Sequence, residues 1–143
     1  MNGGLSALER SGSSPASGPV HILIVEDDPA VADMYRLKLE MDGYDVAVAP
    51  DGEAAVEAAL VRPPDLVFLD IRLPKLDGIG VLERMRAHPR LAHVPVVVLS
   101  NYSERGVVDR CLALGAREYL VKSRTTPARL SERAHHHLAE KAR

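Results

Sequence analysis

The chain has 143 residues and a mass of 15.5 kDa, a length that suits one compact domain. Hydrophobic residues make up 46% and charged residues 27%, which argues against global disorder and fibrous repeats. The net charge of −2 argues against a protein that coats nucleic acid, so we expect no direct nucleic-acid contact. Residues 101–143 carry 9 basic and 5 acidic side chains. This basic end is expected to be a solvated helix surface, with steering of an acidic partner as the alternative.

The cysteine content and the lack of long apolar runs indicate in which cellular compartment the chain is found. The lone Cys111 excludes an intramolecular disulfide framework, favours a reducing compartment, and falls on an apolar helix face, so we expect it in the core. The longest apolar run, Val94–Leu99, is much shorter than the roughly 18 residues that span a bilayer. The N-terminus has no basic segment followed by an apolar core, as a secretory signal would. The sequence therefore predicts a cytoplasmic chain without membrane insertion.

Strand-like runs begin after a segment rich in Ser, Gly and Pro. Residues 1–19 cannot bury enough apolar surface to fold, so they are expected to form a flexible tail before one domain over residues 20–143. Five short apolar runs are expected to be strands: His21–Val25, Asp45–Ala49, Leu66–Leu69, Val94–Leu99 and Glu118–Val121. Four of them are largely apolar on both faces, which is typical of strands covered on both sides.

Apolar residues at helical spacing occupy the stretches between these runs. Gly52–Val61 is rich in Ala and suits a helix, and Thr126 before Pro127 is typical of a helix start. Five such β-α units predict an α/β fold: a doubly wound, five-stranded parallel sheet with helices on both faces. Ligands of such sheets bind beyond the carboxyl ends of the strands.

Charged and polar residues follow four of the expected strands: Glu26-Asp27-Asp28, Asp70, Ser100-Asn101 and Lys122. Carboxylates gathered at one edge repel each other unless a cation joins them, and their hard oxygens suit Mg²⁺. A carboxylate can attack phosphorus and form an acyl phosphate, while a metal ion, an ammonium and a hydroxyl neutralise the transferred group. The set is therefore chemically sufficient for Asp70 to accept a phosphoryl group.

Five segments in order resemble the receiver domains of two-component response regulators: Ile22–Pro29, Pro64–Asp70, Leu73–Gly78, Pro95–Ser100 and Gly115–Lys122. The resemblance extends over about residues 20–140. It implies a flavodoxin-like sheet with strand order 2-1-3-4-5. It also implies a phosphorylation switch, not an enzyme that turns over a substrate, with a sensor histidine kinase or a histidine phosphotransfer domain as phosphoryl donor.

The family's roles carry over residue by residue as implications of this resemblance. Asp70 matches the phosphoacceptor, Ser100 the switch hydroxyl, Lys122 the lysine that pairs with the phosphoryl group, and Tyr119 the aromatic that turns inward. The implied ligands of Mg²⁺ (or Mn²⁺) are Asp27, Asp70, the backbone carbonyl of Arg72 and, through water, Glu26. Asp28 is a weaker candidate because it would also cap the next helix well.

The sequence departs from the family pattern near the expected phosphoryl group. Ser123, where the family usually has Pro, follows Lys122. A cis bond before a non-proline residue costs about 2.5–4 kcal/mol, so we expect a trans bond and a shifted loop. Asn101 and Arg72 would flank the phosphoryl group, and our hypothesis is that they tune its lifetime. Only 21 residues follow Lys122, which favours a single-domain regulator acting through its fourth helix, fifth strand and fifth helix. A receiver fragment of a longer protein is the alternative.

Three other interpretations of the sequence are weaker. A phosphatase of the haloacid dehalogenase type needs a second Asp two residues after the first, and Arg72 stands there. A protein-interaction module that is not phosphorylated does not need the complete set of acid, hydroxyl and lysine. The run His135-His136-His137 cannot hold one metal ion with all three rings, because consecutive helical residues point about 100° apart. We expect that run to be an exposed helix end.

Overall fold

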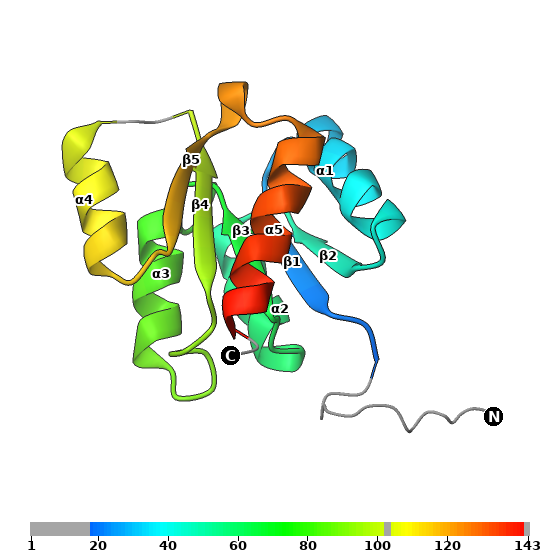
Figure 1. Ribbon diagram of the computed structural model, residues 1–143. Helices are drawn as coiled ribbons and strands as arrows, with labels where there is room; N and C mark the ends of the chain where they lie inside the picture. The colour runs from blue at the N-terminus through cyan, green and yellow to red at the C-terminus, as the bar shows by residue number, and fades with distance from the viewer. Residues whose placement is uncertain (1–17, 102–103, 142–143) are drawn as a thin grey trace.

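The computed structural model describes residues 18–101 and 104–141, which form one five-stranded parallel sheet with order β2-β1-β3-β4-β5 (Figure 1). The strands are β1 (His21–Val25), β2 (Asp45–Ala49), β3 (Leu66–Leu69), β4 (Val96–Ser100) and β5 (Glu118–Val121). The helices are α1 (Pro29–Met41), α2 (Gly52–Val61), α3 (Gly78–Ala87), α4 (Arg105–Ala113) and α5 (Pro127–Lys141), with a 3-10 turn at Lys122–Arg124. The predicted α/β fold and strand order are confirmed. Residues 1–17 of the predicted tail lie outside the described residues.

The predicted strand bounds agree with the structure except at β4, which begins two residues later and ends one residue later than expected. Pro95 has no N–H for the ladder, and the N–H of Val94 donates instead to the Leu91 carbonyl in a turn. The Pro95 carbonyl still accepts from the N–H of Val67 on β3. The strand therefore starts at Val96, after the proline.

Both faces of the sheet are buried, as the apolar strand runs predicted. Ile22 and Ile24 face one side, where Tyr35 of α1 and Leu130 of α5 pack among a cluster of apolar side chains. Alternate residues of the same strands face the other side, where α2, α3 and α4 cover them. Cys111 of α4 is fully buried in that second cluster, as predicted. Among the described residues, no helix is long and apolar enough to cross a bilayer.

Side-chain caps fix where the helices begin. Asp51 and Asp77 each accept a hydrogen bond from a backbone N–H in the first turn of α2 and α3. The Thr126 hydroxyl accepts from the N–H of Arg129 at 3.1 Å, so the predicted start of α5 is confirmed. Such caps satisfy N–H groups that have no partner within the helix.

One arginine joins the loops that precede β4 and β5. The Arg86 guanidinium of α3 donates to five backbone carbonyls, those of Leu91, Ala92, Val94, Leu114 and Gly115, at 2.8–3.5 Å. Burial lowers the pKa of Arg86, and the nearby positive charge of Arg117 lowers it further. No sequence motif marks Arg86, because all five partners are backbone atoms of two distant loops.

The expectation of an exposed histidine run holds for two of the three residues. His135 and His136 are exposed, but His137 is only 4% exposed, so the expectation is wrong there. The second half of α5 lies against the start of β5, where His137 Nε2 is 2.7 Å from Glu118 Oε1. The 100° step along a helix turns one of three consecutive side chains inward, which explains the difference.

Candidate functional site

The predicted site residues meet at the carboxyl edge of the sheet. A hollow of about 480 Å³ opens there, lined by Asp27, Asp70, Arg72, Ser100, Asn101 and Lys122. These residues follow or end β1, β3, β4 and β5, which run parallel, so their carboxyl ends lie at one edge. The structure thus brings together side chains that are up to 95 residues apart in the sequence.

Three carboxylates and one ammonium lie together at this edge of the sheet. Glu26, Asp27 and Asp70 each offer an oxygen within 4.8 Å of the others. Glu26 and Asp70 are buried, whereas Asp27 is exposed. The Lys122 ammonium lies between the two buried acids and donates to Glu26 Oε1 and to Asp70 Oδ2, both at 2.6 Å. The cluster has more negative than positive charge, so it favours a further cation.

Burial and hydrogen bonding shift the pKa values of this cluster in opposite directions. Burial raises the pKa of Glu26, although hydrogen bonds from Lys122 and from the N–H of Asp28 act against it. Burial alone would lower the pKa of Lys122, but its hydrogen bonds to Asp70 and Glu26 outweigh burial and raise that pKa. The lysine therefore keeps its positive charge at neutral pH.

The backbone around Asp70 holds its second carboxylate oxygen. Asp70 Oδ1 accepts from the N–H of Ile71 at 2.7 Å and from the N–H of Arg72 at 3.4 Å. The start of α3 approaches closely: a Cβ on Gly78 would lie 2.3 Å from the Asp70 carbonyl oxygen. The Gly78 N–H donates to the Ile71 carbonyl at 2.8 Å. Glycine at 78 therefore allows the loop after β3 to fold tightly behind the acid.

Asp28 has the capping role that the sequence left open. Its Oδ1 accepts from the N–H groups of Ala30 and Val31 at 3.0 and 3.4 Å, which makes it the N-cap of α1. Its own N–H donates to Glu26 Oε2 at 3.0 Å. These contacts account for Asp28 without a metal ion and hold Glu26 in place.

The segment after β5 is held by contacts that the sequence did not suggest. Asn101 Oδ1 accepts from the N–H of Ser123 at 2.8 Å and so joins the end of β4 to the turn after Lys122. The Tyr35 hydroxyl donates to the Thr125 carbonyl at 2.7 Å. Every peptide bond in the described residues is trans, so the trans bond predicted before Ser123 is confirmed.

The two predicted switch residues lie on neighbouring strands. Ser100 is the last residue of β4 and is buried at the hollow. Tyr119, the second residue of β5, is half-buried and packs against the apolar cluster beneath α2, α3 and α4. Ser100 therefore lies at the hollow, and Tyr119 lies on the side of the molecule that carries α4.

The family comparison agrees with this geometry. The model of the response regulator receiver domain matches residues 22–135. The chain belongs to this family. Receiver domains act as phosphorylation switches in two-component signalling, and the motif-based resemblance is confirmed.

Individual relatives are similar in sequence and in structure. RpaA of Synechocystis, a DNA-binding transcriptional regulator, is 42% identical over 101 residues, which cover 71% of this chain and 42% of that protein. PdtaR of Mycobacterium tuberculosis, a transcriptional regulatory protein, is 40% identical over 75% of this chain and 51% of its own length. The chain thus spans about half the length or less of these relatives.

Solved structures show the same architecture. A CheY-like receiver domain protein from Methanospirillum hungatei superposes with a TM-score of 0.81 at 28% identity, over 87% of this chain and 98% of the other. A response regulator structure from Chloroflexus aurantiacus gives 0.78 at 34% identity, over 85% and 98%. The likeness extends over nearly the whole of those chains.

Proposed function

We propose that the chain is a signalling switch in which Asp70 accepts a phosphoryl group from a phosphohistidine of a sensor kinase or phosphotransfer domain. The observation that carries this proposal is the Asp70 carboxylate, which is buried at an open hollow with one oxygen held by backbone N–H groups and the other paired with Lys122. A carboxylate oxygen of Asp70 attacks phosphorus, the P–N bond breaks, and the imidazole takes up a proton as it leaves.

The donor set of the hollow fits Mg²⁺ or Mn²⁺. Three carboxylates stand against one ammonium, and carboxylate and carbonyl oxygens suit these ions. We assign the ion to Asp27, Asp70 and the Arg72 carbonyl, with Glu26 acting through water. When bound, the ion neutralises charge on the oxygens of the transferred group.

The remaining residues respond to the new phosphoryl group. Lys122, which pairs with Asp70 Oδ2 before transfer, moves to the phosphoryl oxygens, and the Ser100 hydroxyl donates to them. This movement changes the packing of Tyr119 and so biases the surface formed by α4, β5 and α5. That surface is where we place the contact with a downstream protein.

The switch reacts once per phosphoryl group, so we do not assign it a turnover activity. We place the switch domain at residues 20–143 and its site of action in the cytoplasm, where kinases make phosphohistidine from ATP. DNA binding, which the name of RpaA includes, is not assigned to this chain, because the match covers 42% of that protein.

Incubation with acetyl phosphate and Mg²⁺, followed by intact mass measurement, tests the proposal. We expect the chain to gain one phosphoryl group and Asp70→Asn to gain none. Asp33→Asn, which changes an exposed aspartate of α1, is the matched control and should still be modified. Modification of Asp70→Asn would contradict the assignment. Failure of the unaltered chain to bind Mg²⁺ or beryllofluoride would favour an interaction module that is not phosphorylated.

A further inference from the structure

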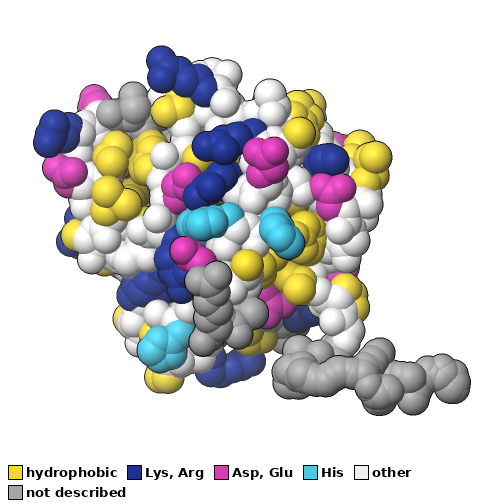
Figure 2. All heavy atoms as spheres, in the orientation of Figure 1, with side chains coloured by type: hydrophobic (Ala, Val, Ile, Leu, Met, Phe, Trp, Pro, Cys, Tyr) yellow, Lys and Arg dark blue, Asp and Glu magenta, His cyan; other side chains and the backbone are white. Residues whose placement is uncertain are grey.

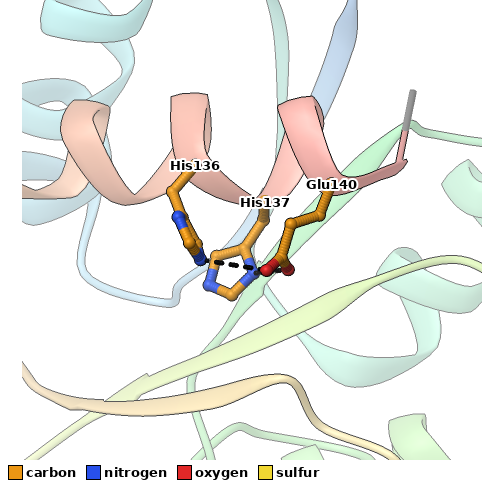
Figure 3. A group of neighbouring side chains, drawn as sticks. All are labelled: His136, His137 and Glu140. Atoms are coloured by element: carbon orange, nitrogen blue, oxygen red, sulfur yellow. Dashed lines mark ion pairs between the residues drawn. The ribbon is translucent and has the colours of Figure 1, made fainter. Parts of the chain in front are cut away.

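A second group of potential metal ligands lies on α5, outside the hollow. His136, His137 and Glu140 each offer one ligand atom within 4.8 Å of the others, and Figure 3 shows the two rings and the carboxylate directed toward one another. His136 Nε2 is 3.3 Å from Glu140 Oε2, and His137 Nδ1 is 3.9 Å from Glu140 Oε1. Glu140 is four positions after His136 and three after His137, a spacing that brings side chains together. The two histidines are adjacent, and their ring centroids are 5.0 Å apart in an edge-to-face arrangement.

His137 carries the argument, because its hydrogen bonding determines its tautomer. Its Nε2 is 2.7 Å from Glu118 Oε1, and an ionised carboxylate only accepts, so Nε2 holds the proton. In the tautomer with its proton on Nε2, Nδ1 has a free lone pair. That atom is buried and has no hydrogen-bond partner among the described residues. A buried lone pair that faces the Glu140 carboxylate is unfavourable unless a cation lies between them.

We propose that His136 Nε2, His137 Nδ1 and a Glu140 oxygen bind a zinc ion. Two imidazole nitrogens and one carboxylate oxygen are a common ligand set for zinc, and the fourth position stays open to water or to a ligand from a partner. Zn–N bonds of about 2.0–2.1 Å place the atoms of a tetrahedral site roughly 3.3 Å apart. The His136–Glu140 pair already has this separation, and small side-chain rotations bring the third atom in.

The surroundings of His137 resemble the support that metal-bound histidines usually have. A carboxylate that accepts from the second ring nitrogen orients the ring and raises its basicity, and Glu118 has this position. Arg133 donates to the same Glu118 oxygen at 2.8 Å and fixes it. Arg117, 3.9 Å from Glu140 Oε1, is the competing cation, and its half-exposed side chain can move into solvent.

The zinc site is separate from the magnesium site. Glu118 is the first residue of β5, whereas Lys122 follows its last residue, so the two groups lie at opposite ends of this strand. Figure 2 shows imidazole, basic and acidic side chains mixed on the side of the molecule that α5 covers. All three ligands lie on α5, and the hydrogen bond between His137 and Glu118 links them to the start of β5. If the proposed function is correct, a bound zinc ion stiffens the α5 part of the output surface.

Calorimetric titration of the untagged full chain with Zn²⁺, in excess Mg²⁺ to occupy the acidic hollow, tests the site. We expect one equivalent of zinc to bind. His136→Ala and Glu140→Gln each remove an exposed ligand and should weaken binding at least about tenfold. His135→Ala, the exposed neighbour outside the group, is the matched control and should leave the affinity unchanged. Zinc should also raise the melting temperature of the chain but not that of His136→Ala.

Three results of the zinc titration would overturn the proposal, and none of them affects the assignment of Asp70. The first is no zinc binding, and the second is equal weakening by His135→Ala. In the third, binding is lost in Asp27→Asn but retained in His136→Ala, which would place zinc in the hollow. Ring-nitrogen NMR gives an independent result: zinc should shift the Nδ1 signal of His137. If both ring nitrogens of His137 are protonated at neutral pH and zinc changes neither NMR signal, a proton and not zinc is bound at Nδ1. That result would also contradict the proposal.

Discussion

The two edges of the sheet contain similar charged side chains but balance them in opposite ways. At the carboxyl edge the Lys122 ammonium forms ion pairs with both Glu26 and Asp70, and the Asp27 carboxylate lies close by. At the amino edge, where β5 begins, the Glu118 carboxylate pairs with both Arg133 and His137. The carboxyl edge therefore has unbalanced negative charge that favours binding of a cation. At the amino edge the Glu118 carboxylate already has partners within the molecule.

The contacts of Arg86 are a second difference between the two edges. Its guanidinium satisfies five backbone carbonyls of the loops that enter β4 and β5, so the amino edge is fixed mainly by contacts that contribute to stability. The contacts of the carboxyl edge surround the groups to which we assign phosphoryl transfer. We expect substitutions at the amino edge to change the free energy of unfolding, and substitutions at the carboxyl edge to change phosphorylation.

Arg86→Ala should have the largest effect of the substitutions considered. It removes the side-chain donor from five carbonyls, of which that of Leu91 keeps the N–H of Val94, and we expect a loss of about 3 kcal/mol in the free energy of unfolding, measured by urea denaturation. Arg84→Ala, at an exposed position of the same helix, should cost less than about 0.5 kcal/mol. The folded fraction of Arg86→Ala should take up a phosphoryl group at the normal rate. A slower rate would show that the two edges are not independent.

Lys122→Ala tests the carboxyl edge. Loss of the ammonium removes a charged group from the transferred phosphoryl oxygens, so the rate of phosphorylation by acetyl phosphate should fall roughly 100-fold. The same change leaves Glu26 and Asp70 without their cation, so Mg²⁺ should bind more tightly, as a titration of the metal would detect. Arg133→Ala is the counterpart at the amino edge and should change neither quantity. Weaker Mg²⁺ binding by Lys122→Ala would mean that the lysine does not compete with the metal ion.

The two edges also differ in how much of their structure the sequence could predict. Polar residues after apolar runs are a local pattern, and the parallel topology alone brings Asp27, Asp70 and Lys122 together. The five-carbonyl contact of Arg86 leaves no such pattern, because its partners are backbone atoms whose side chains are free to vary. The burial of His137 depends on how α5 lies against β5, and the bond between Asn101 and Ser123 depends on the path of two loops. These features follow from tertiary packing and not from local sequence.

The amino-edge carboxylate should make stability depend on pH. Burial raises the pKa of Glu118, but hydrogen bonds from His137 and Arg133 outweigh burial and lower it. A lowered pKa stabilises the fold above the unfolded value of 4.5 and loses that contribution as the pH falls through the folded pKa. Unfolding with a chelator present should show Glu118→Gln less stable by about 1 kcal/mol at pH 7, with the difference shrinking below pH 4.5. A difference that is constant with pH would contradict this account.

Asn101→Ala should have the smallest effect, a dephosphorylation rate increased a few-fold. Asn101 accepts from the N–H of Ser123 and lines the hollow, so its removal loosens the turn after Lys122 and opens a path for water to the acyl phosphate. The measurement is the decay of the phosphorylated mass after acetyl phosphate is removed. Ser123→Ala keeps the N–H that Asn101 binds and should decay at the normal rate. An unchanged decay in Asn101→Ala would leave Arg72 as the remaining candidate for lifetime control, and Arg72→Ala would then be decisive.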